Sequence, residues 1–176
     1  MNICIIGPSK SGKTTLAYDL AHCMGPGATV VDVGQIVRIT ADEKDQQIIN
    51  AGQLSSRGDK GTNWVDEIVD KAVANQKDGL IIVGYPRTID QYVHIEGKGF
   101  IIVCHMASYA TIASRTVRKR PDDKYNEVKL NWFYGSLSYI GKKVDLWTST
   151  EMSYIQIAQT LDNIYPDRPF TLAKRK

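Results

Sequence analysis

The fold of this chain is decided by the stretch Gly7-Pro8-Ser9-Lys10-Ser11-Gly12-Lys13-Thr14-Thr15. It fits the pattern G-x-x-x-x-G-K-[ST], follows a short apolar run and opens a segment with helical periodicity. Glycines in such a loop let backbone N–H groups turn inward around phosphate oxygens, and the helix N-terminus adds a partial positive charge. The stretch therefore predicts a phosphate-binding loop between a strand and a helix.

The residue types of this loop point to ATP as its ligand. We expect all nine residues, Gly7–Thr15, to contact ATP, with Lys13 reaching the β- and γ-phosphates. We expect Thr14 to meet Mg²⁺ directly or through water. Thr15 is a candidate for contact with the α-phosphate. ATP and Mg²⁺ are thus the expected cofactors.

Short apolar runs alternate with helical segments along the rest of the chain. Continuous runs rich in Ile and Val suit strands that are buried on both faces of a parallel sheet. The runs are Ile3–Ile6, Thr29–Val33, Leu80–Val83, Phe100–Cys104 and Val144–Trp147. Thr148 and Glu151 have the spacing of a capping box for a last helix. The alternation predicts a single α/β domain over residues 1–176, with a parallel sheet.

The composition argues against several classes of protein. The net charge of +3, from 22 basic and 19 acidic residues, is too weak to indicate a nucleic-acid partner. No apolar stretch has the length of a membrane span and no secretory signal begins the chain, so we expect no membrane partner and a cytoplasmic location. Cys4, Cys23 and Cys104 lack the number and spacing of a disulfide framework or zinc site, and we expect buried thiols. A monomer is the favoured state.

A second motif, Gly84-Tyr85-Pro86-Arg87-Thr88-Ile89-Asp90-Gln91, follows the run Leu80–Val83. Ligands of open α/β sheets lie beyond the carboxyl ends of the strands, and Arg87 there can offer a bidentate fork to a phosphate. With this motif the chain resembles adenylate kinase and its nucleoside-monophosphate-kinase relatives, whose pattern here is D-G-[FY]-P-R-T-x-x-Q. The resemblance covers roughly residues 1–165.

The resemblance implies the three-layer α/β/α fold of P-loop NTPases. Its parts are a five-stranded parallel sheet, a monophosphate-binding helical arm at about 34–75 and a short lid at about 118–125. The segment Val33–Arg38 looks like the family's [ST]-G-D-x-x-R, Ala51–Leu54 like its G-K-L segment, and Arg120–Asp123 like its R-x-D-D.

Roles for individual residues follow from the same resemblance. Arg38 and Arg87 match the arginines that hold the acceptor phosphate, and Gln91 matches the glutamine that contacts the acceptor base. The implied substrate-binding residues are Gly34, Arg38, Leu54, Gly84, Arg87 and Gln91. The implied catalytic residues are Lys13, Arg87, Arg118 and Arg120.

The chain departs from the family's pattern at four positions. Val83 stands where the family has an Asp that organises water around Mg²⁺, and Gln35 replaces an Asp of the arm. Val33 replaces a Thr near the acceptor base, so adenine specificity is not supported. Asn131 stands where a lid-proximal arginine is expected. The lid itself is short.

Asp32 is the best substitute for the carboxylate that Val83 lacks. It closes the apolar run that begins at Thr29, and it should end at the same sheet edge as the phosphate loop. Two interpretations remain open. Asp32 either orients the waters of Mg²⁺, with Thr14 completing the protein side, or caps the helix that begins near Gly34.

The leading prediction is transfer of the γ-phosphoryl group of ATP to a nucleoside or deoxynucleoside monophosphate. Small nucleotides are then the expected partners. One alternative is a small-molecule kinase of the shikimate or gluconate type, which the short lid and Asp32 favour. The other is a nucleotide-binding pseudokinase with a regulatory or scaffold role, which Val83 and Asn131 favour.

Overall fold

A computed structural model describes residues 1–40, 63–76, 78–119, 127–167 and 170 of the chain. The strands are β1 (Asn2–Ile6), β2 (Thr29–Asp32), β3 (Leu80–Val83), β4 (Phe100–Met106) and β5 (Leu146–Ser149). The helices are α1 (Lys13–Met24), α2 (Val33–Thr40), α4 (Asn63–Asn75), α5 (Ile89–Ile95), α6 (Tyr109–Lys119), α7 (Glu127–Ile140) and α8 (Tyr154–Ile164), with a 3₁₀ turn, η1, at Gly141–Lys143.

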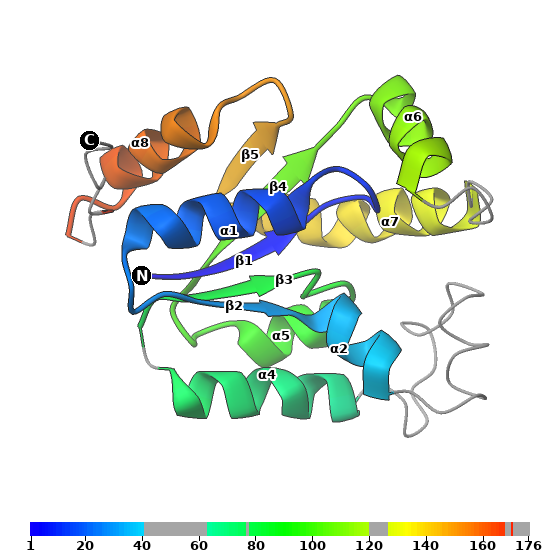
Figure 1. Ribbon diagram of the computed structural model, residues 1–176. Coiled ribbons are helices and arrows are strands. Elements are labelled where there is room, and N and C mark those ends of the chain that lie inside the picture. Colours follow the sequence, from blue (N-terminus) through cyan, green and yellow to red (C-terminus); the bar gives the residue numbers. More distant parts are fainter. Residues whose placement is uncertain (41–62, 77, 120–126, 168–169, 171–176) are drawn as a thin grey trace.

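The five strands form one parallel sheet in the order β2-β3-β1-β4-β5. In Figure 1 the strands run side by side between two layers of helices. The expected five-stranded parallel sheet and three-layer α/β/α fold are therefore confirmed. Because all strands are parallel, their carboxyl ends meet at one edge, where the loop after β1 also lies.

Alternate residues of the central strands pack on opposite faces of the sheet. Ile3 and Ile5 join the core beneath α1 and α8. Cys4 and Ile6 join the core shared with α4, α5 and α7. This double burial explains the unbroken apolar runs, because a central strand has no face that water reaches.

Four expected strands and one expected cap differ from the structure. The first strand begins one residue earlier than expected, at Asn2, and the fourth ends two residues later, at Met106. The second strand ends at Asp32, and Val33 already belongs to α2. The fifth strand lies two residues later than expected, at Leu146–Ser149, so Thr148 pairs in the sheet and cannot cap a helix. The capping box of α8 is instead formed by Ser153 and Gln156.

The predicted arm and lid are described only in part. Helix α2 begins one residue before the arm segment 34–75, α4 lies within that segment, and α6 ends at Lys119, inside the lid segment 118–125. Cys4, Cys23 and Cys104 are buried free thiols, as expected. Within the described residues, no helix is both long and apolar enough to span a membrane.

Candidate active site

The phosphate loop links β1 to α1 in a conformation that requires its glycines. Gly7 has φ of 147°, and a Cβ there would lie 2.2 Å from the backbone oxygen of His105. Gly12 has φ of 99° and occupies the N-cap of α1. Among the described residues, no side chain accepts a capping hydrogen bond from the N–H groups at the start of this helix. The first N–H groups of α1 are thus open to an anion, and the loop fits the phosphates of ATP.

Ser11 provides a second sign that the loop is built for a ligand. Its hydroxyl is fully buried and has no hydrogen-bond partner among the described residues. It lies 3.2 Å from the point where a Gly7 Cβ would stand. Buried polar groups are almost always satisfied in proteins, and an exception at a loop of this kind is expected where a ligand supplies partners.

Lys13 lies within the loop, close to the acceptor motif. Its Nζ donates a hydrogen bond of 2.6 Å to the backbone oxygen of Pro8. Burial and the charge of Arg87 lower the pKa of Lys13 to about 7, against the opposing effects of Asp32 and Cys104. The ammonium therefore sits in an environment that favours its neutral form until anionic groups arrive.

Asp32 caps α2, which is one of the two roles that the sequence left open, and it also contacts Thr14, its expected partner in the other role. One carboxylate oxygen accepts a hydrogen bond of 2.8 Å from the Thr14 hydroxyl. The other accepts one of 2.9 Å from the backbone N–H of Gln35, in the first turn of α2. In the sheet, Asp32 is the register partner of Val83. A carboxylate thus stands one strand away from the position where the resemblance expects one, and with Thr14 it forms an oxygen pair that suits Mg²⁺.

The acceptor motif folds Arg87 back over the end of β3. The Arg87 Nε donates a hydrogen bond of 2.7 Å to the backbone oxygen of Gly84. Gly84 has φ of 78°, and a Cβ there would lie 3.0 Å from Arg87 Nη2. The neighbouring Tyr85 is fully buried, and its hydroxyl donates a 2.7 Å hydrogen bond to Asp66 of α4. Gln91 is also buried, and its Oε1 accepts the backbone N–H of Arg87 at 2.8 Å.

His105, at the end of β4, belongs to this edge although the sequence analysis did not single it out. Its Nδ1 lies 2.9 Å from the Thr148 hydroxyl, and its Nε2 lies 3.6 Å from the point where a Gly12 Cβ would stand. Burial, Lys13 and Arg115 lower the pKa of His105 to about 4, so its ring is neutral at pH 7. The sequence signal was its place directly after an apolar run, at the carboxyl edge.

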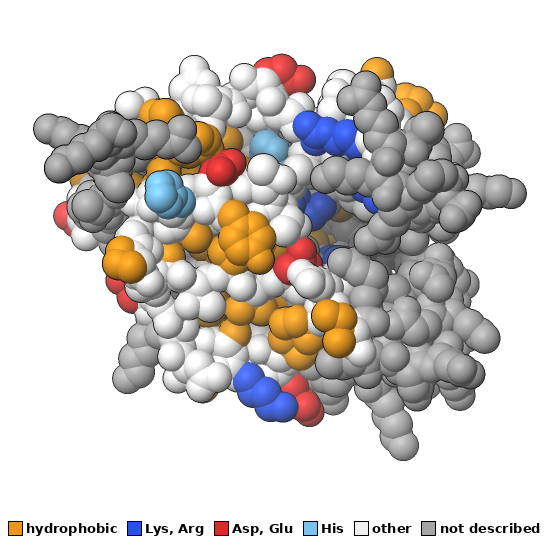
Figure 2. Space-filling view, in the orientation of Figure 1, with side chains coloured by type: hydrophobic (Ala, Val, Ile, Leu, Met, Phe, Trp, Pro, Cys, Tyr) orange, Lys and Arg blue, Asp and Glu red, His pale blue; other side chains and the backbone are white. Residues whose placement is uncertain are grey.

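Arg115 of α6 also contacts the phosphate loop. Its Nη1 donates a 3.1 Å hydrogen bond to the backbone oxygen of Lys10, a residue with φ of 66°. In Figure 2 Lys and Arg side chains gather on the side of the molecule where Figure 1 draws the phosphate loop. This concentration of positive charge suits a polyanionic ligand.

The remaining expected site residues are described less fully. Gly34 lies in the first turn of α2. Arg38 belongs to α2 and Arg118 to α6, but the structure does not describe their side chains. Leu54 and Arg120 lie outside the described residues. Among the described residues, no group of three His, Cys, Asp or Glu side chains could hold a metal ion.

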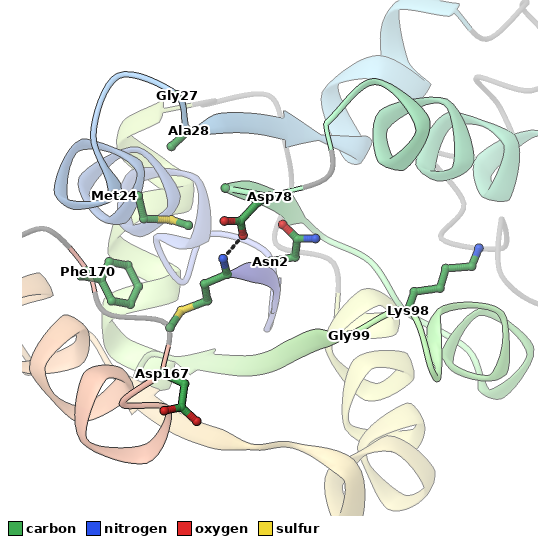
Figure 3. Close-up of a pocket in the computed structure, with 11 residues that line it drawn as sticks. Asn2, Met24, Gly27, Ala28, Asp78, Lys98, Gly99, Asp167 and Phe170 are labelled. Atoms are coloured by element: carbon green, nitrogen blue, oxygen red, sulfur yellow. Dashed lines mark hydrogen bonds and ion pairs between the residues drawn. The ribbon is translucent and has the colours of Figure 1, made fainter.

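A cavity of about 690 Å³ lies at the opposite, amino edge of the sheet. Figure 3 shows it between the start of β1 and the turns before β2 and β3, with the Met1 ammonium directed at Asp78. Ligands of open α/β sheets bind beyond the carboxyl ends of the strands, so we place the candidate active site at the phosphate loop and not in this cavity.

Comparison with known sequences gives partial matches to adenylate kinases. The chain is 30% identical over 97 residues to adenylate kinase of Thermococcus gammatolerans, covering 54% of this chain and 42% of that protein. It is 31% identical over 100 residues to adenylate kinase of Haloarcula marismortui, covering 54% and 45%. The chain thus spans less than half the length of these curated relatives. No family model matches.

Comparison with solved structures gives P-loop kinases over nearly the whole chain. A gluconokinase from Sinorhizobium meliloti superposes with a TM-score of 0.62 and 11% identity, covering 94% of this chain and 96% of that one. Shikimate kinase from Acinetobacter baumannii, in complex with shikimate, gives a TM-score of 0.58 and 17% identity, covering 94% and 93%. At such low identity these matches show the fold. Together with the sequence matches they support the resemblance to adenylate-kinase-like P-loop kinases.

Proposed function

We propose that this chain transfers the γ-phosphoryl group of ATP to a nucleoside or deoxynucleoside monophosphate, giving the diphosphate and ADP. The observation that carries the proposal is the convergence of Lys13 and Arg87 at one sheet edge. The charge of Arg87 lowers the pKa of Lys13, so the phosphate loop and the acceptor motif are electrostatically coupled. The partial identity to adenylate kinases supports a nucleotide as the acceptor.

The reaction needs positioning and charge neutralisation from these residues. An ionised oxygen of the acceptor phosphate attacks the γ-phosphorus, and the bond from that phosphorus to the bridging oxygen of ADP breaks. Because the attacking oxygen is already ionised, no general base is required. Lys13 would neutralise charge on the donor and Arg87 would hold the acceptor phosphate. Arg38, Arg118 and Arg120 are proposed to assist.

Thr14 and Asp32 would hold Mg²⁺ in this reaction. When bound, Mg²⁺ would offset the negative charge of the donor phosphates. The hydroxyl of Thr14 and the carboxylate of Asp32 already contact each other, so the pair is preorganised. The ion would keep most of its waters, which suits a site with few protein oxygens.

A kinase of a small polyhydroxylated acid is the second candidate. The gluconokinase and shikimate kinase structures match over 94% of this chain, whereas the adenylate kinase sequences match 54%. Such an acceptor has an alcohol that must lose a proton. Asp32, at the edge where the acceptor would lie, is a carboxylate that could accept it.

A panel assay separates these functions. ADP release would be measured with ATP·Mg²⁺ and each common ribo- and deoxynucleoside monophosphate, gluconate or shikimate, and ³¹P NMR would identify the product. We expect at least one monophosphate to raise ADP release about a hundredfold over hydrolysis, and Lys13→Ala to remove this rate. Higher kcat/KM with an acid would favour the second candidate. ATP binding with no turnover on any acceptor would contradict both.

A further inference from the structure

The first turn of α5 carries a displaced capping box. Thr88 is the N-cap, and its Oγ1 accepts the backbone N–H of Gln91 at 3.2 Å. In an ordinary capping box the third helical residue reaches back to the N–H of the N-cap itself. Gln156 does so in α8, with 2.9 Å between its Oε1 and the N–H of Ser153. Gln91 instead reaches one residue further, to the N–H of Arg87 at 2.8 Å.

The displaced bond fixes the residue that is proposed to hold the acceptor phosphate. The Arg87 side chain is exposed, but it is tied to Gly84 through Nε, and its backbone is tied to Gln91. Gln91 itself is 4% exposed. A side chain that reads a ligand's base must present its polar atoms to the ligand, and the amide oxygen of Gln91 is already engaged inside the protein.

We propose that Gln91 is a positioning residue for Arg87 and does not read the acceptor base. This inference rests on the proposed function, in which Arg87 grips the acceptor phosphate, and it replaces the role that the family resemblance implies for Gln91. The phosphate is common to all nucleoside monophosphates. A change at Gln91 therefore weakens the binding of every acceptor by the same factor and leaves the preference among bases unaltered.

Two substitutions separate positioning from base reading. Gln91→Met keeps the length of the side chain and removes the acceptor for the Arg87 N–H. Gln91→Glu keeps that acceptor and removes the amide N–H₂ group that a base could contact. Gln156→Met is the matched control, because it removes the equivalent bond from the capping box of α8, which packs elsewhere against α1.

Hydrogen exchange of the Arg87 amide, followed by NMR, is the readout that does not depend on activity. We expect exchange to rise roughly tenfold in Gln91→Met, because loss of one hydrogen bond frees the amide. It should stay near the wild-type rate in Gln91→Glu and in Gln156→Met. Unchanged Arg87 exchange in Gln91→Met would overturn the proposal.

Kinetics with a panel of monophosphates is the second readout. For Gln91→Met we expect the acceptor KM to rise roughly three- to tenfold by the same factor for every base, with the KM for ATP unchanged. In both Gln91 variants the ratio of kcat/KM between bases should remain that of the wild type, and a change in that ratio would show base reading. If the wild type phosphorylates no monophosphate, the proposed function fails, and the exchange experiment still decides whether Gln91 holds Arg87.

Discussion

The ammonium of Lys13 occupies a position where its charge is unfavourable before a polyanion binds. Its pKa is lowered to about 7, first by burial and then by Arg87. The folded pKa is below the ordinary value of 10.5, so between pH 7 and 10.5 the unfolded chain binds more protons and stability rises with pH. Bound phosphate oxygens should raise the pKa of Lys13 again, because they favour its charged form.

Binding of ATP should therefore be accompanied by proton uptake at Lys13. At pH 7.5 we expect the wild type to take up between about half a proton and one proton more than Lys13→Met, because the lysine is then largely neutral before binding. Titration calorimetry in two buffers of different ionisation enthalpy measures the difference. Equal uptake by the two proteins would show that Lys13 is already charged in the free protein.

Asp32 contacts Thr14, in the proposed Mg²⁺ site, and also the first turn of α2. Its replacement should therefore affect both Mg²⁺ binding and the stability of the helix. In Asp32→Asn one oxygen can still cap Gln35, but the carboxylate that faces Thr14 is lost. We expect kcat to fall at least about tenfold and the Mg²⁺ concentration for half-maximal rate to rise.

Adding Val83→Asp to this variant tests the assignment further. Because Val83 is the register partner of Asp32, the new carboxylate should lower the Mg²⁺ concentration for half-maximal rate part of the way back to the wild-type value. The double variant should be less stable than Asp32→Asn, because Val83 is 1% exposed and the new carboxylate would be buried. Loss of thermal stability with unaltered Mg²⁺ dependence in Asp32→Asn would leave Asp32 as a helix cap alone.

His105 should make the stability of the protein depend on pH in the acid range. Its pKa is lowered to about 4 by burial, Lys13 and Arg115, with Glu151 opposing. The ordinary value is 6.5, so this contribution to stability is complete above pH 6.5 and is lost as the pH falls towards 4. His105→Gln should lose less stability between pH 7 and 5 than the wild type does, as measured by urea unfolding. An equal loss in both proteins would contradict the lowered pKa.

The sequence identified Lys13, Thr14 and Arg87 because each belongs to a contiguous motif whose spacing has a chemical reason. It missed His105 because a single histidine after an apolar run forms no pattern. The Thr148 partner that fixes its ring is 43 residues away. The sequence also named Thr14 and the helix start as alternative partners of Asp32, but it could not show that Asp32 contacts both, since that depends on how β2, α2 and the phosphate loop meet in space.

The connection between β3 and α5 places Arg87, and Gly84 is its critical point. Gly84 and Gly97 have φ values of 78° and 80°, so an alanine at either position meets the same backbone strain. Only at Gly84 does the new Cβ crowd a site residue, at 3.0 Å from Arg87 Nη2, whereas nothing lies within 4 Å at Gly97.

Alanine at these two glycines should therefore have different effects on activity. Both variants should lose roughly 1 kcal/mol of stability from strain. Gly84→Ala should in addition raise the acceptor KM several-fold, while Gly97→Ala leaves it unchanged. Thermal unfolding and steady-state kinetics measure the two quantities. Equal acceptor KM values for the two variants would show that Arg87 does not need Gly84.

At the level of elements, the sequence predicted which segments are strands and helices better than where they end. Thr148–Glu151 and Ser153–Gln156 have the same capping spacing. Their local sequences do not distinguish them, because the choice depends on pairing of β5 with β4, which keeps Thr148 in the sheet. The start of β5 was placed too early for the same reason.

At the level of the whole molecule, apolar runs predicted a parallel sheet but could not give its strand order. The order β2-β3-β1-β4-β5 puts β1 at the centre, between β3 and β4. Gly7 after β1, Gly84 after β3 and His105 near the end of β4 consequently lie at one edge. The opposite edge carries the cavity beside Met1 and Asp78, so the cavity and the phosphate loop lie at opposite ends of the strands.

The last prediction concerns which edge binds ATP. A ligand at 100 times its Kd stabilises the folded state by about 2.7 kcal/mol, which for a domain of this size raises Tm by roughly 5–10 °C. Asp78→Asn weakens the ion pair with the Met1 ammonium at the amino edge and leaves the carboxyl edge untouched. Its Tm should therefore rise with a non-hydrolysable ATP analogue and Mg²⁺ by the same amount as that of the wild type. Lys13→Met should show a much smaller rise, because the loop loses the ammonium group that is expected to neutralise the phosphates. A full rise in Lys13→Met together with an altered one in Asp78→Asn would place the nucleotide in the cavity and reject the phosphate loop as its site.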